Sequence, residues 1–528
     1  MKARVIILLF LALFLPASSV TVGGKTVSSD LSPLDFGLES ATTGVGRYDV
    51  LLKTHKQALS RGVNVNYSGI KEIALEIPEN AERIPLTQDN DFQGCVFVVT
   101  NKQKTVYLFD APEKPNPIPV LKSEIDAGDF RRHPEVAQGL FLLLIEDGNP
   151  WVDNRQGYSY GHTRKDILLL KDGVAQNKVI MPYDNEESAP VCSYVKADPL
   201  PFVVRNLTIK RTEESTAITN VMFVAGKNDV SLTNVTLHTP ENDWRNDRAI
   251  RIDDCTNVRF EKVTIDGTYS QTGHSGYGIS FDNIWNFTAN HLVGYGKWGV
   301  FGTNNVSTVF IENSAINRFD IHCYGRDVSF LRVAFTDKYN QLNSVFGKVV
   351  FDQCTFTRFD PIRIGSSYNA YVPFDVYFNE CVFNAGKENN VLLRLGKNDA
   401  VINARKELRS KCWPNIYIKN LTVNMDESTN EFNFVYTAIG GRGAVSKVDY
   451  ISRIMVDSLQ INSTNDNIRL SITPKPVDTF NEVDCTFRNV TINNRPIEEN
   501  KDVRMRSNIP LKNGRIDYMM REESKVKQ

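Results

Sequence analysis

The sequence has almost no net charge, few helix signals, and no motif typical of a zinc or nucleotide site. Its 61 Lys and Arg residues nearly balance 62 Asp and Glu residues, which leaves a formal net charge of −1 at pH 7. A chain so close to neutral has no general attraction for nucleic acid or for an anionic membrane, so a charged binding site has to be local. The other proportions, 41% hydrophobic and 23% charged residues, are those of an ordinary soluble globular protein.

Long hydrophobic runs are also scarce. One unbroken apolar run, Val5–Leu15, follows a basic start, and small residues precede Val20. The run is too short to span a bilayer comfortably, and no second run follows it. We therefore predict that residues 1–19 are a signal peptide, that the mature chain has no membrane span, and that it is exported to the periplasm, the cell surface or the medium.

A short phrase of alternating apolar residues recurs along the chain. It reads VSLTNVTL from Val230, VRFEKVTI from Val258 and VYFNECVF from Val376. Eleven copies begin between Phe202 and Cys485, with starts 19 to 40 residues apart. Repetition at such a period predicts a solenoid, in which each repeat is one turn, or rung. The asparagine of the phrase suits a tight turn between strands.

Eight cysteines in an exported chain raise the question of disulfides. Cys354 and Cys381 fall at the same phase of adjacent repeats. We interpret them as small hydrophobic residues stacked inside the coil rather than as a disulfide framework.

The clearest helix signal is Arg47–Arg61, which has apolar residues at helical spacing and is followed by Gly62. A solenoid needs its open end covered, and this helix is suited to that role. The predicted division is then as follows: residues 20–110 are the N-terminal cap and first rungs, 111–495 are the parallel coil with an insert near 146–165, and 496–528 are a C-terminal cap and charged tail. The insert is rich in aromatic and cationic side chains, as binding loops on solenoids often are.

A second strand precedes the phrase in each central repeat, and its alternate residues should point outward. One predicted outward column consists of Arg251, Ser280, Phe301, His322, Arg363 and Arg394. The neighbouring predicted column consists of Asp253, Asp282, Thr303, Tyr324, Gly365 and Gly396.

The pairing of a G-I-x-[IF] strand with a V-x-F-x-N-x-x-[FI] phrase resembles the right-handed parallel β-helix of the superfamily that contains pectate lyase, chondroitinase B and polygalacturonase. The resemblance covers roughly residues 65–495, and the N-terminal stretch is similar to that of exported polysaccharide-degrading proteins of gut bacteria. It implies an all-β fold, a right-handed parallel β-helix with an N-terminal capping helix. It also implies that a polysaccharide lies along the sheet of the G-I-x-I strands.

A cationic strip on that sheet indicates a polyanionic ligand, because guanidinium groups bind carboxylate or sulfate through two hydrogen bonds. We expect an acidic polysaccharide, pectin-like or glycosaminoglycan-like, and its cleavage by β-elimination. That reaction needs a neutralised carboxylate, a base for the C5 proton and an acid for the leaving oxygen. The predicted catalytic residues are His322, Tyr324, Arg363 and Lys297. The predicted substrate-binding residues are Arg251, Arg326, Lys348, Arg394 and Trp298.

Three alternatives stay open at this point. Asp253 and Asp282 on adjacent rungs could serve a glycoside hydrolase, although the N-T-D, G-D-D and G-H-G runs of polygalacturonase-like enzymes are absent. The same two aspartates could bind calcium, which some β-helix lyases use. A coil without catalysis, acting as an adhesin or a glycan-binding surface protein, would show the same repeats. The sequence leaves the oligomeric state open.

Overall fold

The computed structural model describes residues 30–102, 106–152, 162–184, 186–215, 219–239, 249–267, 277–295, 299–322, 324–336, 338–343, 345–358, 360–364, 374–386, 390–395, 415–426, 429–437, 453–465, 467–473, 484–497, 503–505 and 517–519. The predicted signal peptide lies outside these residues.

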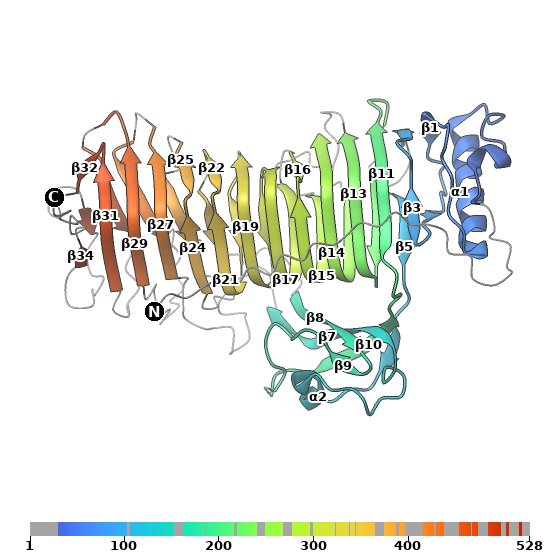
Figure 1. The fold of residues 1–528 in the computed structure, drawn as a ribbon, viewed down its shortest axis with the longest axis horizontal. Coiled ribbons are helices and arrows are strands. Elements are labelled where there is room, and N and C mark those ends of the chain that lie inside the picture. Colours follow the sequence, from blue (N-terminus) through green and yellow to red (C-terminus); the bar gives the residue numbers. More distant parts are fainter. Residues whose placement is uncertain are drawn as a thin grey trace, which may run out of the picture.

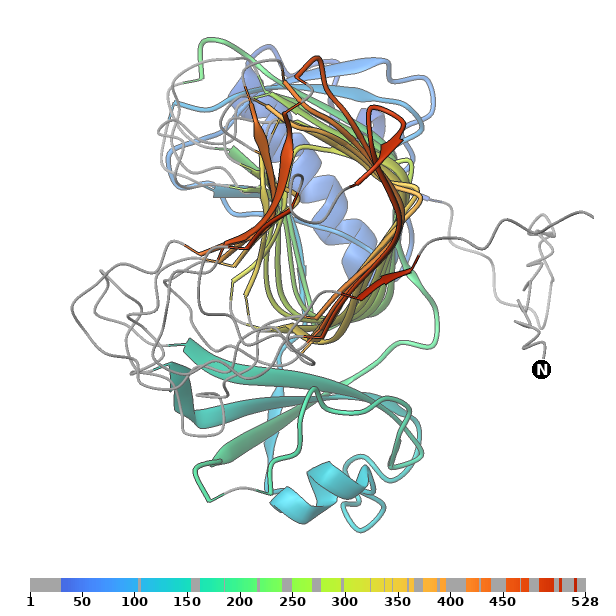
Figure 2. The ribbon, with the colours of Figure 1, turned by 90° about the vertical axis from the view of Figure 1, so that its left-hand side faces the viewer.

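One long coil of parallel strands forms most of the molecule (Figure 1). Each rung pairs in register with the next, so that Val258 pairs with Phe287, and Phe287 pairs with Val309. Seen along its axis, the coil encloses a core between its strand walls (Figure 2). The predicted all-β fold, a right-handed parallel β-helix, is confirmed.

One wall of the coil carries the candidate site, and we call it sheet A. It consists of the first residues of β14 (Ile250–Gly267), β15 (Tyr277–Asn290) and β17 (Gly299–Ile316), together with β2 (Ile84–Pro85), β5 (Val106–Pro112), β12 (Thr219–Ala225), β18 (Phe319–Ile321), β20 (Asn340–Leu342), β23 (Ile362–Ile364), β26 (Val391–Leu395), β28 (Glu431–Thr437), β30 (Arg469–Thr473) and β33 (Val503–Met505).

The remaining walls are built from the later parts of the long strands and from shorter ones. The strands are β1 (Glu72–Glu76), β3 (Asp89–Asp91), β4 (Val96–Thr100), β11 (Phe202–Arg211), β13 (Asn228–Thr239), β16 (Val293–Gly294), β19 (Gly325–Thr336), β21 (Val345–Asp352), β22 (Thr355–Thr357), β24 (Phe374–Asn379), β25 (Val382–Asn384), β27 (Asn415–Asn424), β29 (Arg453–Asn462), β31 (Asp484–Ile492), β32 (Arg495–Pro496) and β34 (Asp517–Met519).

Asparagines turn the chain at the corners of the coil. Asn206, Asn234 and Asn286 all have a positive φ, a conformation that asparagine adopts more readily than most residues. Their side chains also link rungs, since Asn234 Nδ2 donates to Asn206 Oδ1 at 2.9 Å. The structural role predicted for the asparagine of the repeat phrase is confirmed at Asn206 and Asn234, and Asn286, just before a copy of the phrase, turns another corner.

Stacked aromatic rings fill the core. The rings of Phe330, Phe351 and Phe378, on three successive rungs, stack with centroids 5.1 and 5.2 Å apart. This spacing is close to the distance between neighbouring strands, about 4.8 Å, so one residue type can repeat without leaving a gap. Of the eight cysteines, the six that the structure describes are buried and free, as predicted for Cys354 and Cys381.

A helix covers the N-terminal end of the coil. After the short 3₁₀ turn η1 (Pro33–Phe36), α1 runs over Gly44–Arg61, which confirms the predicted capping helix and starts it three residues earlier. The Thr43 hydroxyl accepts a hydrogen bond from the Gly46 amide at the N-terminus, and Gly62 ends the helix with a φ of 64°.

A separate small domain interrupts the coil between β5 and β11. Its five strands, β6 (Asn116–Ile118), β7 (Leu140–Val152), β8 (His162–Lys171), β9 (Val174–Ala175) and β10 (Pro190–Lys196), form an antiparallel sheet with α2 (Lys122–Ala127) beside it. We call it the inserted domain. It projects from one side of the coil (Figures 1 and 2).

The inserted domain is larger than the insert predicted near residues 146–165, because its apolar segments were assigned to the coil. Leu143 and Leu168 are buried in a core of the domain's own, next to Phe130 and Tyr183. The aromatic and cationic loop itself, residues 153–161, lies outside the described residues. At the other end, β33 and β34 still pair in parallel with the coil, so rungs continue past the predicted boundary at residue 495. In the part of the chain that the structure describes, we find no helix that is long and apolar enough to cross a membrane.

Candidate functional site

Sheet A presents one column of residues on its outer side, and the strand register fixes its members. In chain order they are Phe223, Arg251, Ser280, Gly302, Asp320, Gln341, Arg363, Arg394 and Tyr436. Arg251, Arg363 and Arg394 therefore lie in one column, as the sequence predicts. Neighbouring members are about 4.8 Å apart along the axis.

The register differs from the prediction at two rungs. Phe301 and Phe319 both point into the core, so the outward places belong to Gly302 and Asp320 rather than to Phe301 and His322. The predicted residue is one position too early at Phe301, which reverses the face, and two positions too late at His322, which keeps the face but leaves the column. The His322 amide instead donates to the Thr303 carbonyl oxygen at the end of the strand.

A tyrosine that the sequence analysis did not select completes the site around His322. The Tyr277 hydroxyl lies 2.7 Å from His322 Nε2 and donates to Asp320 Oδ2 at 2.7 Å. The ring of Tyr277 covers Gly302, where an added Cβ would lie 2.3 Å from the tyrosine ring. Gly302 thus leaves the space that this ring occupies, and the His322 side chain remains 18% exposed at its edge.

Beneath this pair lies a fully buried ion pair. Arg318 Nε donates to Asp320 Oδ1 at 2.5 Å, and neither side chain is exposed to solvent. Arg318 Nη2 donates to Gln341 Oε1 at 3.0 Å. Burial alone would raise the pKa of Asp320, but Arg318 and His322 outweigh it and hold this pKa below its ordinary value. Asp320 is therefore an ionised acceptor that orients Tyr277.

A second buried carboxylate holds two guanidinium groups in place farther along the column. Asp360 is fully buried and accepts hydrogen bonds from Arg363 Nη2 at 3.1 Å and from Arg394 Nη2 at 3.2 Å. Arg363 also lies 3.7 Å above the ring of Tyr339, and Arg394 lies 4.8 Å above the ring of Tyr436. Two cations share one anion, so this stretch of sheet A keeps a fixed excess of positive charge.

Aromatic rings and cations also gather at the N-terminal part of sheet A. The rings of Tyr107 and Phe223 lie 5.5 Å apart, with Arg83 and Arg251 packed over Phe223 at 5.6 and 5.4 Å. Arg251 Nε donates to Asp253 Oδ2 at 2.7 Å. Arg251 is therefore on the predicted face, three rungs before Asp320.

Two predicted site residues contact the inserted domain, and one of them is covered by it. Tyr324, expected to point outward, is 1% exposed, and its hydroxyl donates to the Thr163 carbonyl oxygen. Arg326 Nη1 donates to the Ile180 carbonyl oxygen at 2.5 Å. The prediction that Tyr324 points outward is wrong, because the inserted domain packs on this corner. Arg326 pairs with Ser307 away from sheet A, and its side chain is 43% exposed, so its predicted role in substrate binding stays a prediction.

Lys348 also lies away from sheet A. Its rung contributes Gln341 to the outer column, whereas Lys348 pairs with Asp375 on another wall and lies 5.9 Å from the Tyr377 ring. Lys297 and Trp298 lie outside the described residues.

The two aspartates considered for calcium have protein cations as partners. Asp253 pairs with Arg251, and Lys165 Nζ of the inserted domain lies 2.9 Å from Asp282 Oδ2. Over the described ranges, no group of three or more His, Cys, Asp or Glu side chains is arranged to hold a metal ion. Lys165 thus places a positive charge beside Asp282, where a calcium ion was one of the alternatives left open by the sequence.

Asp254, next to these residues, is a carboxyl group whose protonation couples stability to pH. Burial raises the pKa of Asp254 to about 6, and the hydrogen bond that Asn283 Nδ2 donates to it at 2.7 Å only partly opposes this shift. The folded state then binds a proton more tightly than the unfolded state, so stability is present at low pH and is lost as pH rises from about 4 to about 6.

We expect Asp254→Asn to remove this loss. Above pH 6 the variant should be more stable than the parent by about 3 kcal/mol, and the difference should vanish below about pH 4. Denaturant unfolding across this pH range measures it. Asp282→Asn is the matched control and should destabilise, since it removes the partner of Lys165. A less stable Asp254→Asn protein at pH 8 would contradict the assignment.

Tyr277 was not predicted from the sequence, and neither Asp320 nor Asp360 was among the predicted site residues. One signal was available: the tripeptide Arg-Phe-Asp occurs at Arg318–Asp320 and again at Arg358–Asp360. In both places the aspartate is fully buried beside a guanidinium group. Tyr277 begins its strand in a Gly-rich segment, and only the spatial position of Gly302 shows where its ring lies.

Comparison with known proteins supports the fold. No protein-family model and no curated protein matches the sequence. Among solved structures, the gp54 tailspike of Acinetobacter baumannii bacteriophage AP22, determined in complex with A. baumannii capsular saccharide, superposes with a TM-score of 0.50 at 11% identity, over 88% of this chain and 79% of that one.

Two further tailspikes are similar at a lower level. The protein gp49 from Pseudomonas phage LKA1 gives a TM-score of 0.45 at 12% identity, over 88% of this chain and 81% of that one. The protein gp61 from Pseudomonas phage phi297 gives 0.44 at 10% identity, over 91% and 84%. At 11% identity, the likeness to the AP22 tailspike shows a shared fold alone.

Proposed function

We propose that this protein binds an acidic polysaccharide along the outer side of sheet A and cleaves it by β-elimination. The observation that carries the proposal is the Tyr277–His322 pair, hydrogen-bonded to a buried carboxylate, two rungs before a fixed pair of arginines. Binding of a capsular saccharide by the AP22 tailspike supports saccharide binding on a coil of this type.

Each of these groups has a separate role in the proposed reaction. Arg363 and Arg394 neutralise the uronate carboxylate, which makes the C5 proton more acidic. Tyr277 and His322 share the remaining roles: one takes the C5 proton, and the other gives a proton to the leaving oxygen as the C4–O bond breaks. The electron pair of the C5–H bond becomes the C4=C5 double bond of the product. Asp320 keeps Tyr277 oriented.

Hydrolysis by paired carboxylates fits these residues less well. Asp320 and Asp360 are fully buried and already accept hydrogen bonds from arginines. A general acid must reach the glycosidic oxygen, and its partner must reach a water or the sugar carbon. The buried aspartates are therefore suited to orient other groups.

A polysaccharide panel with two readouts tests the proposal. We expect ultraviolet absorbance of an unsaturated uronate to rise with at least one pectin-like or glycosaminoglycan-like polymer, and not with neutral polymers. New reducing ends without this absorbance would favour a hydrolase. Binding without any product would leave a glycan-binding coil.

Arg363→Ala should weaken use of the acidic substrate. Loss of a charge-assisted contact costs about 1.5–3 kcal/mol, which corresponds to a decrease of roughly 10- to 100-fold in kcat/KM. Steady-state kinetics at two salt concentrations measures it, and the variant should also depend less on salt. Lys348→Ala, which removes a cation from another wall of the coil, should leave kcat/KM unchanged. Equal losses in both variants would contradict the placement.

A further inference from the structure

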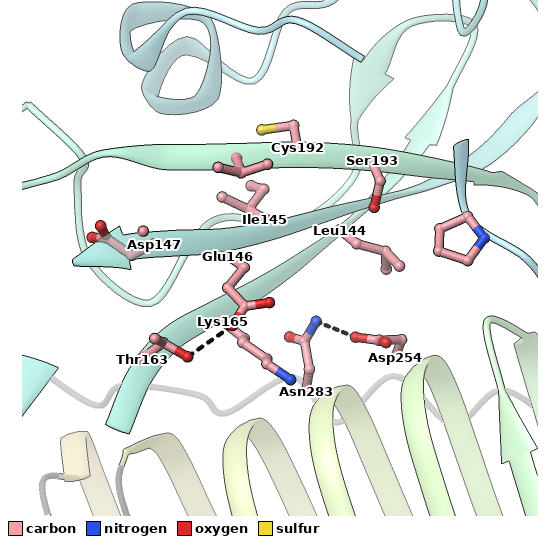
Figure 3. A pocket seen from close by; sticks show the side chains of 13 residues that line it. Leu144, Ile145, Glu146, Asp147, Thr163, Lys165, Cys192, Ser193, Asp254 and Asn283 are labelled. Carbon is pink, nitrogen blue, oxygen red and sulfur yellow. Dashed lines mark hydrogen bonds between the residues drawn. The ribbon is translucent and has the colours of Figure 1, made fainter. Parts of the chain in front are cut away.

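A cavity of about 440 Å³ lies between the inserted domain and the coil, beside sheet A (Figure 3). Strands β7, β8 and β10 of the inserted domain form its walls, and Asp254 and Asn283 of the coil form its floor. Its volume lies within the range of small-molecule sites, roughly 300–1,000 Å³.

Contacts between the two parts fix the shape of this cavity. The Lys165 amide donates to Asn305 Oδ1 at 3.0 Å, and Lys165 Nζ pairs with Asp282. On the floor, Asn283 Nδ2 donates to Asp254 Oδ1 at 2.7 Å. Strand β8 therefore sits firmly on the coil, so the polar groups of the cavity are positioned before any ligand arrives.

The charge of the cavity differs from that of sheet A near Arg363. Its lining contains the carboxylates of Glu146, Asp147 and Asp254, and one ammonium group, that of Lys165. Lys165 is already paired with Asp282. Carboxylate or sulfate groups would therefore be repelled here, whereas they are attracted near Arg363.

The polar groups are nevertheless suited to hydroxyl-rich molecules. The Thr163 hydroxyl donates to Glu146 Oε1 at 3.0 Å, and the Ser193 hydroxyl lies across the cavity (Figure 3). Carboxylates accept hydrogen bonds from sugar hydroxyl groups, while amide and ammonium groups donate hydrogen bonds to the oxygens of those hydroxyl groups. Leu144 and Val191 add apolar lining. Such a mixture of donors, acceptors and apolar surface matches a neutral pyranose.

We propose that this cavity binds a neutral sugar unit, and that the glycan therefore carries neutral sugars as well as uronates. Binding of a neutral sugar in the cavity does not depend on the proposed function. The statement that the same glycan also carries uronates does rest on it. Asp282, which holds Lys165, is two rungs before the level of Asp320, or about 10 Å along the axis. A neutral unit in the cavity and a uronate at Tyr277–His322 are thus within the reach of one short oligosaccharide.

Titration with free monosaccharides tests the site. The probes are glucose, galactose, mannose and xylose, with glucuronate and galacturonate as acidic counterparts, each up to 100 mM and followed by ligand-observed NMR. At least one neutral sugar should bind the full-length protein, and binding should weaken at least ~10-fold in Asn283→Ala and in Ser193→Trp, which fills the cavity. Lys196→Trp places the same large side chain at an exposed position of β10 and should bind like the parent.

Each outcome decides the matter. Any one of three results would overturn the inference. The first is that none of the four neutral sugars binds, and the second is that the uronates bind equally well in the cavity. The third is that binding is unaffected in a Ser193→Trp protein that circular dichroism shows to be folded. Neutral-sugar binding in a protein that releases no unsaturated product would leave the cavity assignment standing and remove the proposed lyase function. Unsaturated product without neutral-sugar binding would overturn the cavity assignment and leave the proposed lyase function standing.

Discussion

Replacing Tyr277 by Phe is expected to reduce turnover of the acidic polysaccharide by roughly 10²- to 10⁴-fold, the usual contribution of a general acid or base. The substitution removes only the hydroxyl that lies 2.7 Å from both His322 Nε2 and Asp320 Oδ2. The loss should appear in kcat rather than in KM, because the ring remains in place. Ser280→Ala, one rung before Gly302 in the same column, is the matched control and should keep most of the activity.

A second substitution tests whether the position of the Tyr277 hydroxyl matters as well as its presence. In Gly302→Ala the new methyl group would lie 2.3 Å from the ring of Tyr277, so the ring must move although its hydroxyl is retained. We expect a loss of activity that approaches that of Tyr277→Phe, with little change in the midpoint of unfolding. Full activity in both variants would show that Tyr277 has no part in the reaction.

Among the substitutions proposed for this protein, Arg318→Met should cause the largest decrease in the free energy of unfolding. Arg318 and Asp320 are both fully buried, so removal of the cation leaves an uncompensated carboxylate in the core. Breaking a buried ion pair on one side costs about 3–5 kcal/mol. Because Arg318 helps to hold the pKa of Asp320 below its ordinary value, the variant should lose most stability at neutral pH and less in acid, where Asp320 binds a proton.

Denaturant unfolding at pH 4 and pH 7 measures this effect. The double variant Arg318→Met with Asp320→Asn should recover part of the stability, since it removes the buried charge as well. Loss of the same size in the single and double variants would show that packing of Arg318 against Tyr339 matters more than its charge.

The repeat phrase was sufficient to predict the coil, because its physical cause is local. Alternate apolar residues such as Val258 and Phe260 must face the core in every rung, and an asparagine such as Asn234 must turn the corner. The capping helix was also predictable, since Gly62 marks its end in the sequence, although its start at Gly44 was placed three residues too late. The phrase repeats along the chain, and the helix signal lies within one short segment. Neither prediction therefore depends on distant residues.

The site was harder to predict because it depends on register and on distant segments. The rung from Gly302 to Asp320 is shorter than the one before it, so Asp320 rather than His322 occupies the outer column. The burial of Tyr324 could not be deduced from its own rung, because its hydrogen-bond partner Thr163 is 161 residues away in the inserted domain. Arg363 and Arg394 were found because Ile-Arg-Ile and Leu-Arg-Leu alternate regularly.

A crystal structure of the His322→Ala protein with a uronate oligosaccharide tests the central claim most directly. The oligosaccharide is taken from whichever polymer the panel identifies. We predict that it lies along the outer column of sheet A, with a uronate carboxylate hydrogen-bonded to Arg363 or Arg394 and the C5 carbon of that sugar facing Tyr277. An oligosaccharide bound on another wall of the coil, or a uronate bound only against the inserted domain, would contradict the account.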